Sequence, residues 1–560
     1  MDYKSYIAEK IAIEGVSREE IESCLAVPPA NDLGDYTLPC FRFSKLLKKS
    51  PAAIAEELRA AIPTDGVLTE VTAVNGYLNF KIDRTGYAAR LIETIRSQRE
   101  AYGSSDEGAG RTICIDYSSI NVAKPFHIGH LSTTVLGSAL VKIYRFLGYR
   151  VVGINHLGDY GTQFGKLIVA YRRWSSPQAV EEGKLKELVR IYVKFHEEAD
   201  KDPALNDEAR AWFKKIEAGD AEANAIFSRF KEITLAEVDK IYQMLNVTFD
   251  SYAGESFYND KMDVVIEELK EKNLLKESEG SMIVDLSDYD MPPCLILKSD
   301  GSSLYATRDL AAAIYRKKTY DFYKCLYVVA YQQNLHFRQF FKVLELMGKP
   351  WAKDMVHVAY GMVSMEDGAM STRSGKVVLL EDVLQKAVEK ARAIIEEKNP
   401  ALEKKDEIAR TVGTGAVIFG ALVNNKIKDI VFSYDKVLNF DGETCPYVQY
   451  TAARCNSVLK KGGTYGAFTV GALTPEEYEL VSILGNFPAV VQSAGEKYEP
   501  SFVTRYAIDL AKAYNQFYFN CKILQSGENE KNFRLALTEC VLITLKNALS
   551  LLGIGVPEQM

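Results

Sequence analysis

Two histidines three positions apart, His127 and His130, have a glycine between them and Lys124 shortly before them. The pair lies at the end of a loop that follows a predicted buried strand and runs directly into a predicted helix. Parallel sheets bind nucleotides at such a position, and a helix amino terminus there offers free amides and a positive dipole to phosphate. Two imidazoles on one helix face could bracket a phosphate chain and follow its charge while a phosphoryl bond breaks. The alternative is that both histidines are incidental polar residues at a helix start.

These residues need a strand before them and a helix after them, and the sequence supplies both. Residues 113–117 have the pattern of a buried strand. Apolar side chains then recur at helical spacing over residues 131–147, before a second strand pattern at residues 151–154. A strand, a helix and a second strand in this order predict a βαβ unit and a parallel sheet.

The same α/β domain is expected to extend over residues 110–385. Strand patterns return at residues 295–297, 326–329 and 357–360. Before them, from about residue 177 to residue 247, the chain is rich in charge and has apolar positions at helical spacing. We therefore expect an α/β domain that is interrupted by a helical insertion and then resumes.

Two further domains are expected on either side of it. Asn75-Gly76 between two short strand patterns is the signature of a β-hairpin, which predicts an α+β domain over residues 1–105. A polar, glycine-bearing run at residues 102–110 marks its end. Residues 386–560 have a helical pattern to the end of the chain, which predicts an all-α domain.

The composition limits the classes of protein to which the chain can belong. Its 560 residues carry 68 basic and 75 acidic side chains, a net charge of −7, which argues against a protein that coats nucleic acid non-specifically. A nucleic acid partner would have to be held by local basic patches and by shape. The nine cysteines lack the spacing of a zinc or redox motif, which favours the reduced cytoplasm and no zinc. Neither a signal peptide nor a membrane-spanning helix is expected.

The segment around the histidines resembles a family signature. His127-Ile128-Gly129-His130, after the first strand of a split parallel sheet, resembles the signature of class I aminoacyl-tRNA synthetases, and residues 121–131 are similar to its arginyl-tRNA synthetase version. Further blocks resemble that family in the same order, at residues 155–165, 211–215, 305–309 and 447–454. The resemblance implies a Rossmann-type catalytic domain, an N-terminal tRNA-recognition domain and a C-terminal anticodon-binding domain.

The second class I signature, Lys-Met-Ser-Lys-Ser, is matched only loosely. The corresponding residues 369–373 contain Ser371 and Arg373 but neither lysine. Since that loop should place a cation on the leaving pyrophosphate, the charge must come from elsewhere. Arginyl enzymes with a degenerate loop resemble this chain in carrying a lysine just before the histidine signature, here Lys124, whose alternative role is that of an ordinary solvated lysine. Arg373 or Lys376 could share the task.

The resemblance assigns two sets of residues to the first chemical step. Catalytic roles fall to Lys124, His127, His130, Ser371 and Arg373. ATP contacts fall to Lys124, Phe126, His127, Gly129, His130, Gly361, Met362 and Val363. Magnesium is expected to arrive on the triphosphate, and no protein-bound metal is expected.

A guanidinium substrate calls for planar, paired acceptors, and Asp309 is the leading candidate. Tyr305, just before it, could offer its ring or hydroxyl to the substrate stem. The alternative for Asp309 is an acid near a helix amino terminus that interacts with the dipole. The resemblance assigns arginine contacts to Asp116, at the α-amino end, and to Asn121, His156, Tyr305, Asp309 and Gln333. Three of these, Asp116, Asn121 and Gln333, fall at or just past the carboxyl ends of predicted strands, where a ligand crevice is expected.

Tyr447, Tyr450 and Arg454 recur at spacings of three and four, so one helix face would present two rings and a guanidinium plane to splayed bases. The alternative is that the tyrosines pack against neighbouring helices. The resemblance implies that these residues and the last one, Met560, contact the anticodon loop. It also implies that the N-terminal domain grips the tRNA corner, through Phe41, Arg42, Lys45, Lys48 and Lys49.

The resemblance implies a two-step reaction. The arginine carboxylate attacks the α-phosphorus of ATP to give arginyl-adenylate, and the 2′ oxygen of the terminal adenosine of tRNA(Arg) then takes the arginyl group. A monomer is expected. Two alternatives stay open: a class I synthetase for a different amino acid, and a catalytically inactive tRNA-binding regulatory protein. The pair Tyr305 and Asp309 argues against the first, and the intact histidine signature argues against the second.

Overall fold

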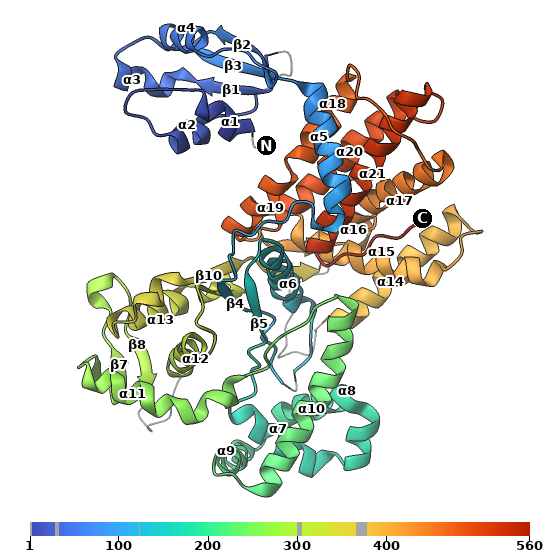
Figure 1. Ribbon diagram of the computed structural model, residues 1–560. Helices are drawn as coiled ribbons and strands as arrows, with labels where there is room; N and C mark the ends of the chain where they lie inside the picture. Colours follow the sequence, from blue (N-terminus) through green and yellow to red (C-terminus); the bar gives the residue numbers. More distant parts are fainter. Residues whose placement is uncertain (1–2, 29–32, 123, 299–304, 366–377) are drawn as a thin grey trace. The chain divides into compact units, whose positions relative to one another are not determined.

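The computed structural model (Figure 1) describes residues 3–28, 33–122, 124–298, 305–365 and 378–560. Contacts divide the chain into two units. The first comprises Met1–Ser97, Gly462–Ser482 and Gln516–Cys540. The second comprises Gln98–Lys461, Ile483–Asn515 and Val541–Met560.

The amino-terminal part of the first unit is a three-stranded antiparallel sheet. Its strand order is β1 (Tyr36–Pro39), β3 (Tyr77–Ile82), β2 (Leu68–Val74). Asn75 (φ 50°) and Gly76 (φ 82°) form the turn between β2 and β3, so the predicted hairpin is confirmed. The helices of this part are α1 (Tyr3–Glu9), α2 (Arg18–Cys24), α3 (Ser44–Leu47), α4 (Pro51–Ala61) and α5 (Arg84–Gln98), of which α4 packs on β2 and β3.

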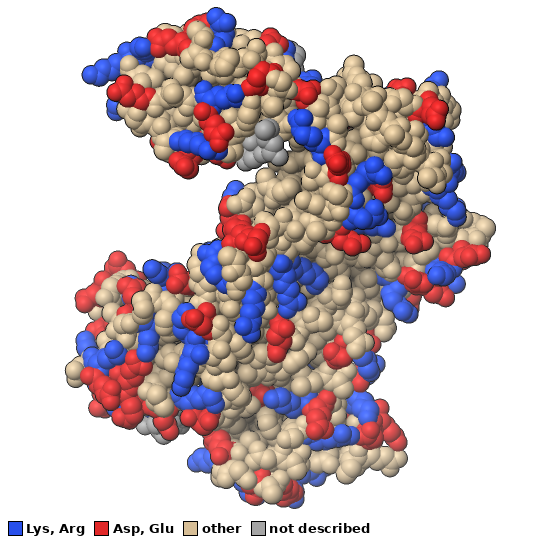
Figure 2. All heavy atoms as spheres, in the orientation of Figure 1, with Lys and Arg blue, Asp and Glu red and all other residues tan. Residues whose placement is uncertain are grey.

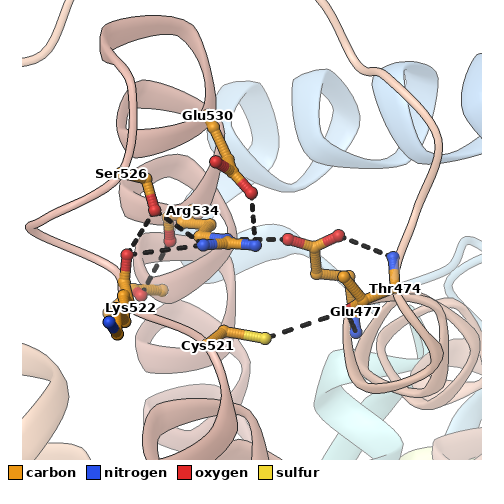
Figure 3. Close-up of polar contacts among 8 residues, drawn as sticks. Thr474, Glu477, Cys521, Lys522, Ser526, Glu530 and Arg534 are labelled. Carbon is orange, nitrogen blue, oxygen red and sulfur yellow. Dashed lines mark hydrogen bonds and ion pairs between the residues drawn. The ribbon is translucent and has the colours of Figure 1, made fainter.

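A buried ion pair joins two helices of the first unit. Arg534 of α21 (Glu528–Leu551) lies with its Nε 2.8 Å from Glu477 Oε1 of α18 (Pro475–Gly485), and the two side chains are only 7% and 3% exposed. Figure 3 shows that Glu530 and Ser526 also contact this guanidinium, at 2.5 Å and 2.7 Å. The charge of Arg534 is therefore fully compensated, as a buried cation requires.

The second unit is built on a four-stranded parallel sheet. Its strand order is β10 (Met355–Tyr360), β9 (Lys324–Ala330), β4 (Thr112–Asp116), β5 (Arg150–Ile154). Helix α6 (Leu131–Phe146) joins β4 to β5, which confirms the predicted βαβ unit. Because the chain passes from β4 to β5 on one side and later adds β9 on the other, the topological switch point lies between β4 and β9.

Three helices pack against this sheet through one buried apolar cluster. They are α11 (Met262–Glu271), α12 (Tyr305–Tyr320) and α13 (Asn334–Leu346). Leu310 and Ala313 of α12 and Phe340 of α13 are fully buried in the cluster beside Cys325 of β9. Helix α12 is thereby held on the sheet.

Two short strand regions differ from the expectation. Residues 295–297 belong to β8 (Cys294–Leu297), which lies in an antiparallel sheet with β7 (Ser281–Val284) and β6 (Leu275–Ser278), outside the parallel sheet. The hairpin turns at Glu279 (φ 49°) and Gly280 (φ 75°), a weak turn signal in sequence. The helical pattern beyond residue 386 is interrupted by β12 (Ile430–Phe432), which pairs with β11 (Val363–Met365) and is too short to show a period of two.

The rest of the second unit is helical. The expected insertion consists of α8 (Pro177–Ala199), α9 (Ala204–Glu217) and α10 (Ala221–Met244), which pack on one another and on α7 (Thr162–Trp174). The later helices are α14 (Leu380–Lys398), α15 (Lys405–Leu422), α16 (Tyr434–Val437), α17 (Cys445–Gly462), α19 (Phe487–Glu496) and α20 (Ser501–Asn520). In the part of the chain that is described, no helix combines the length and apolar character needed to cross a bilayer.

Surface charge is mixed. On the face shown in Figure 2, lysine and arginine are scattered among aspartate and glutamate, and no sign of charge covers the surface continuously. This agrees with the net charge of −7. A polyanionic partner would therefore be held at particular places on the protein, and not by a general electrostatic field.

Candidate active site

Three segments meet beyond the carboxyl end of β4. The loop after β4 carries Asn121, which forms a parallel bridge with Gly158 of the loop after β5. A Cβ on Gly158 would lie 2.4 Å from Asn121 Oδ1, so the glycine permits this close approach. Further along, the backbone of His127 forms an antiparallel bridge with that of Leu379, just before α14. The 3-10 turn η3 (Ile128–His130) contacts β11. The histidine segment is thus held between parts of the chain that are far apart in sequence.

The backbone amides of residues 127–130 all have partners. The His127 amide donates to His130 Nδ1 at 3.2 Å, and the Gly129 amide donates to His127 Nδ1 at 3.1 Å. The other two amides donate to the carbonyls of Val378 and His127. The expectation that this tip offers free amides to phosphate is therefore wrong, because the imidazoles cap it themselves.

The capping determines what the two rings offer to a ligand. Each Nδ1 faces a backbone amide, and His130 Nδ1 also lies 3.3 Å from the His127 carbonyl. Because an amide N–H can only donate, we assign the acceptor role to each Nδ1 and the proton of each neutral ring to Nε2. The ring centroids of His127 and His130 are 4.1 Å apart. Burial lowers the pKa of His127, and burial with the neighbouring His127 lowers the pKa of His130 to about 3. The site thus presents two neutral N–H donors side by side, which suits the oxygens of one phosphate chain.

We expect the ring of His130 to stay neutral from about pH 8 down to about pH 5. Its pKa of about 3 lies below the ordinary 6.5, so this window protonates a solvated imidazole and leaves His130 unprotonated. Long-range ¹H–¹⁵N NMR spectra, assigned with His130→Asn, should show Nε2 protonated and Nδ1 bare throughout. A ring that titrates near its ordinary pKa would contradict the capped geometry.

A lysine supplies the cationic charge beside these donors. Burial lowers the pKa of Lys124, and the carboxylate of Glu255 acts in the opposite direction. The buried ring of Phe126 lies 5.2 Å from the ring of His130 and fixes that side of the pair. Ser371 and Arg373, also expected to act here, lie outside the described residues.

Glu255 belongs to a second charged group that sequence analysis missed. Its Oε2 is 3.6 Å from Arg308 Nη1, and the two side chains are 17% and 7% exposed. The Arg308 guanidinium lies 4.3 Å from the centre of the Tyr160 ring. Burial raises the pKa of Glu255 to about 7, although Arg308 and Lys124 lower it. Glu255 is thus the anionic neighbour shared by Lys124 and Arg308.

The backbone around Gly361 is held by the segment before β12. The amide of Gly361 donates to the carbonyl of Lys426, and the amide of Met362 donates to Asp429 Oδ1 at 2.7 Å. A Cβ on Gly361 would lie 2.4 Å from the backbone of Lys428. Val363 is buried at the start of β11, the strand that contacts η3. Gly361, Met362 and Val363 therefore lie next to the histidine pair.

The candidate guanidinium contact, Asp309, has a partner of its own. Its Oδ2 lies 2.6 Å from His336 Nε2 of α13, with the two side chains 28% and 24% exposed. Sequence analysis missed His336, although it follows β9 by a few residues and the carboxyl-end rule would have found it. Tyr305 begins α12 with 70% of its surface exposed, and Gln333 is exposed at the end of the turn η6 (Tyr331–Gln333).

Asp116 and His156 are brought together by Arg316, another residue that was not predicted. Arg316 Nη2 lies 2.7 Å from Asp116 Oδ2 and 3.4 Å from His156 Nδ1. Asp116 also accepts a hydrogen bond of 2.7 Å from Ser119. Burial lowers the pKa of His156, so its ring is neutral. Both predicted residues therefore lie at the carboxyl ends of β4 and β5, around one buried cation.

The four predicted tRNA contacts line one cavity of about 560 Å³. Tyr447, Tyr450 and Arg454 come from α17, and Met560 ends the chain there. The Arg454 guanidinium lies 5.0 Å from the centre of the Tyr450 ring, which is 42% exposed, and Asn515 of α20 donates to the Tyr447 hydroxyl at 2.9 Å. One open ring, a guanidinium plane and a cavity are what a splayed base requires.

The predicted tRNA contacts of the N-terminal domain form an exposed group. Phe41, Arg42, Lys45, Lys48 and Lys49 are all exposed. Phe41 packs edge-on against the exposed Tyr77, with ring centroids 5.2 Å apart, and Lys49 pairs with Glu57. Among the residues with described positions, no cluster of three or more histidine, cysteine, aspartate or glutamate side chains is arranged to hold a metal ion.

Comparison with known proteins identifies three family regions. Residues 92–434 match the model of the class I (R) tRNA synthetase catalytic domain. Residues 1–82 match the arginyl tRNA synthetase N-terminal domain, and residues 448–560 match the DALR anticodon-binding domain.

Individual relatives match over their full length. The chain is 52% identical to an arginine-tRNA ligase of Clostridium beijerinckii and 51% identical to one of Clostridioides difficile, with each pair covered completely. The arginyl-tRNA synthetase structure of Thermus thermophilus superposes with a TM-score of 0.83 at 27% identity, covering 96% of both chains. The predicted fold class, a parallel-sheet domain with an N-terminal α+β domain and a helical C-terminal domain, is confirmed.

Proposed function

The chain belongs to the class I arginyl-tRNA synthetase family, and from that premise we propose how its residues divide the work. The enzyme attaches L-arginine to tRNA in an ATP-dependent reaction. The observation that carries our assignment is the pair of neutral imidazoles, 4.1 Å apart, at the switch point of the parallel sheet.

In the first step, the arginine carboxylate attacks the α-phosphorus of ATP and pyrophosphate leaves. His127 and His130 would donate from Nε2 to the phosphate oxygens, and Lys124 would carry the positive charge that stabilises the leaving group. Gly361, Met362 and Val363 would pass behind the nucleotide, beside Phe126 and Gly129. Magnesium would arrive with ATP, bound to the triphosphate.

The missing signature lysines make Lys124 the principal cation of this step. We assign a supporting role to Ser371, Arg373 and Lys376, which lie outside the described residues. Glu255 would hold Lys124 and Arg308 in place through its position between the two cations. A carboxylate there offsets their mutual repulsion when no phosphate is bound.

Arginine would lie between the ends of β4 and β9. Asp309 would accept the guanidinium donors, with His336 orienting its carboxylate, and Tyr305 and Gln333 would contribute from the rim of the crevice. Asp116 would bind the α-amino group, with Asn121 and His156 beside it. A site with such paired acceptors rejects lysine, because one ammonium leaves part of the acceptor set unpaired.

In the second step the 2′ oxygen of the terminal adenosine of tRNA(Arg) attacks the activated carbonyl of arginyl-adenylate, the bond between the carbonyl carbon and the phosphate oxygen breaks, and AMP leaves. The cavity between α14 and α17 would hold a base of the anticodon loop, stacked on Tyr450 and Arg454 and bounded by Tyr447 and Met560. The exposed group around Phe41 would contact the tRNA corner.

We propose that the enzyme works as a monomer in the cytoplasm, where its nine cysteines, all described, stay free and buried.

The two alternatives receive less support. Full-length identity of about half with arginine-tRNA ligases disfavours both a different amino acid and a catalytically inactive protein. The intact capped histidine pair and Lys124 are the parts that an inactive relative has no need to keep.

The experiment that tests this proposal is charging of a tRNA(Arg) transcript by the purified chain. We expect arginine to be attached and lysine to be refused. Tyr450→Ala should raise the KM for tRNA about 5- to 150-fold, since stacking contributes about 1–3 kcal/mol per base, and leave the KM for arginine unchanged. Phe519→Ala, which removes an aromatic side chain that is 88% exposed outside the cavity, is the matched control. Equal tRNA KM values for the two variants would remove the cavity from tRNA binding.

A further inference from the structure

Arg316 is among the most deeply buried charged residues of the described chain. Its side chain is 1% exposed and that of Asp116 is 6% exposed, and their closest atoms are 2.7 Å apart. The Arg316 guanidinium also lies 5.4 Å from the centre of the Tyr327 ring. Its Nε and Nη1 have no acceptor among the described residues, so Asp116 is the anion that holds this cation. A buried cation with one anion keeps that pair, because leaving the charge unpaired is costly.

Arg316 and Asp309 lie on the same helix and on the same side of it. They are seven residues apart in α12, which is close to two full turns and a rise of roughly 10 Å. The amino end of this helix is anchored separately, because Thr307 Oγ1 donates to the Ile296 carbonyl at 2.5 Å. The same rigid helix therefore carries Asp309, the proposed contact for the guanidinium, and Arg316, the ion-pair partner of Asp116.

We propose that Arg316 is a positioning residue which sets the separation between Asp116 and Asp309 and thereby selects an amino acid of the length of arginine. The proposal rests on the proposed function, in which Asp116 binds the α-amino group and Asp309 binds the guanidinium. Arg316 itself does not touch the substrate. It joins the end of β4, and through His156 the end of β5, to the helix that carries the opposite end of the pocket.

The mechanism follows from the stiffness of the parts. A helix packed on a sheet does not stretch, and Leu310 and Ala313, which lie between Asp309 and Arg316 in α12, are buried in the cluster that covers the parallel sheet. With the pair intact, a substrate that is one methylene too long cannot reach both carboxylates in good geometry. With the pair broken, the Asp116 carboxylate can rotate away from the end of β4, and the pocket tolerates a longer chain.

The test compares arginine with homoarginine, which is one methylene longer. Charging of tRNA is measured for the wild type, Arg316→Lys and Arg316→Gln. We expect the ratio of kcat/KM for arginine to kcat/KM for homoarginine to fall at least tenfold in Arg316→Gln. Arg316→Lys should lower that ratio less than Arg316→Gln does, because lysine keeps the positive charge, although it lacks the guanidinium and reaches less far. The KM for ATP should change less than twofold in both variants.

Arg534→Lys is the matched control for loss of a buried guanidinium. It replaces the guanidinium of another buried ion pair, in the first unit (Figure 3), and should lower thermal stability without changing the ratio. If Arg316→Lys and Arg316→Gln lower only stability or kcat, with an unchanged ratio, Arg316 has a structural role and the proposal is wrong. Should Arg316→Gln fail to fold, the Lys variant decides by the same ratio. Failure of the substrate assignment is distinguished by Asp309→Asn, whose KM for arginine would then equal that of the wild type.

Discussion

Replacing Lys124 with alanine should lower arginine-dependent exchange between pyrophosphate and ATP about 10²- to 10³-fold, the range found when one stabilising group of a transition state is removed. The assay contains tRNA(Arg), because the family generally needs it for activation. The physical reason is that Lys124 is the principal cation that we assign to this step, beside two neutral imidazoles. Without it, charge that develops on the leaving pyrophosphate loses its main stabilising group.

A second lysine provides the control for this experiment. Lys142 lies on α6, the helix that follows the histidine pair; burial lowers its pKa to about 8, and it donates to Ser138 at 2.6 Å. Lys142→Ala removes a comparable side chain without removing charge from the site, so its exchange rate should stay within a few fold of the wild type. If Lys124→Ala exchanges as fast as Lys142→Ala, Lys124 has no part in the mechanism.

Replacing Asp309 with alanine should reduce kcat/KM for arginine at least 100-fold. A hydrogen bond to a charged group contributes about 1.5–3 kcal/mol, and the guanidinium would lose an ionic acceptor as well as its orientation. The loss should appear mainly in the KM for arginine, while the KM for ATP stays unchanged. The measurement is the steady-state charging rate at varied arginine concentration.

The control for Asp309 lies at the other end of the same helix. Asp321 follows α12, is 90% exposed and pairs with Lys317. Asp321→Ala changes the charge by the same amount and should leave the arginine KM unaltered. His336→Gln should give an intermediate KM, because it removes the partner that orients Asp309 and leaves the carboxylate. A normal arginine KM in Asp309→Ala would show that another residue recognises the guanidinium.

Sequence patterns located the frame of the site because the signals there are local. The strand that became β4, the helix that became α6 and the glycine-bearing segment between them are contiguous, so their order alone predicts a nucleotide crevice. The hairpin at Asn75-Gly76 was predictable for the same reason, since both turn residues adopt the positive φ that such residues tolerate.

The supporting charges could not be predicted, because no local spacing distinguishes them. Arg316 is one of several basic residues near the end of a helix, and only the fold shows that it is buried against Asp116. Glu255 reaches Arg308 from a separate segment, and His336 reaches Asp309 from the next helix. Pairs of this kind arise from tertiary packing, on which a single sequence carries no information.

At the histidine segment the sequence predicted the position of the two rings correctly and the free backbone amides wrongly. The rule that a helix amino terminus has unpaired amides is general, but the side chains that cap it depend on rotamers. Here the imidazoles occupy that role, so the donors for phosphate move from the backbone to Nε2.

The pairing of β11 with β12 limits how this chain can be divided. Residues 430–432, which lie between helices in the sequence, pair with the edge of a strand that lies beside the histidine pair. A fragment that ends before residue 430 would expose the open edge of β11, and open strand edges invite association with other chains. We therefore expect a fragment that lacks residues 386–560 to aggregate. In domain mapping by truncation, a loss of solubility would then be mistaken for a loss of catalytic activity.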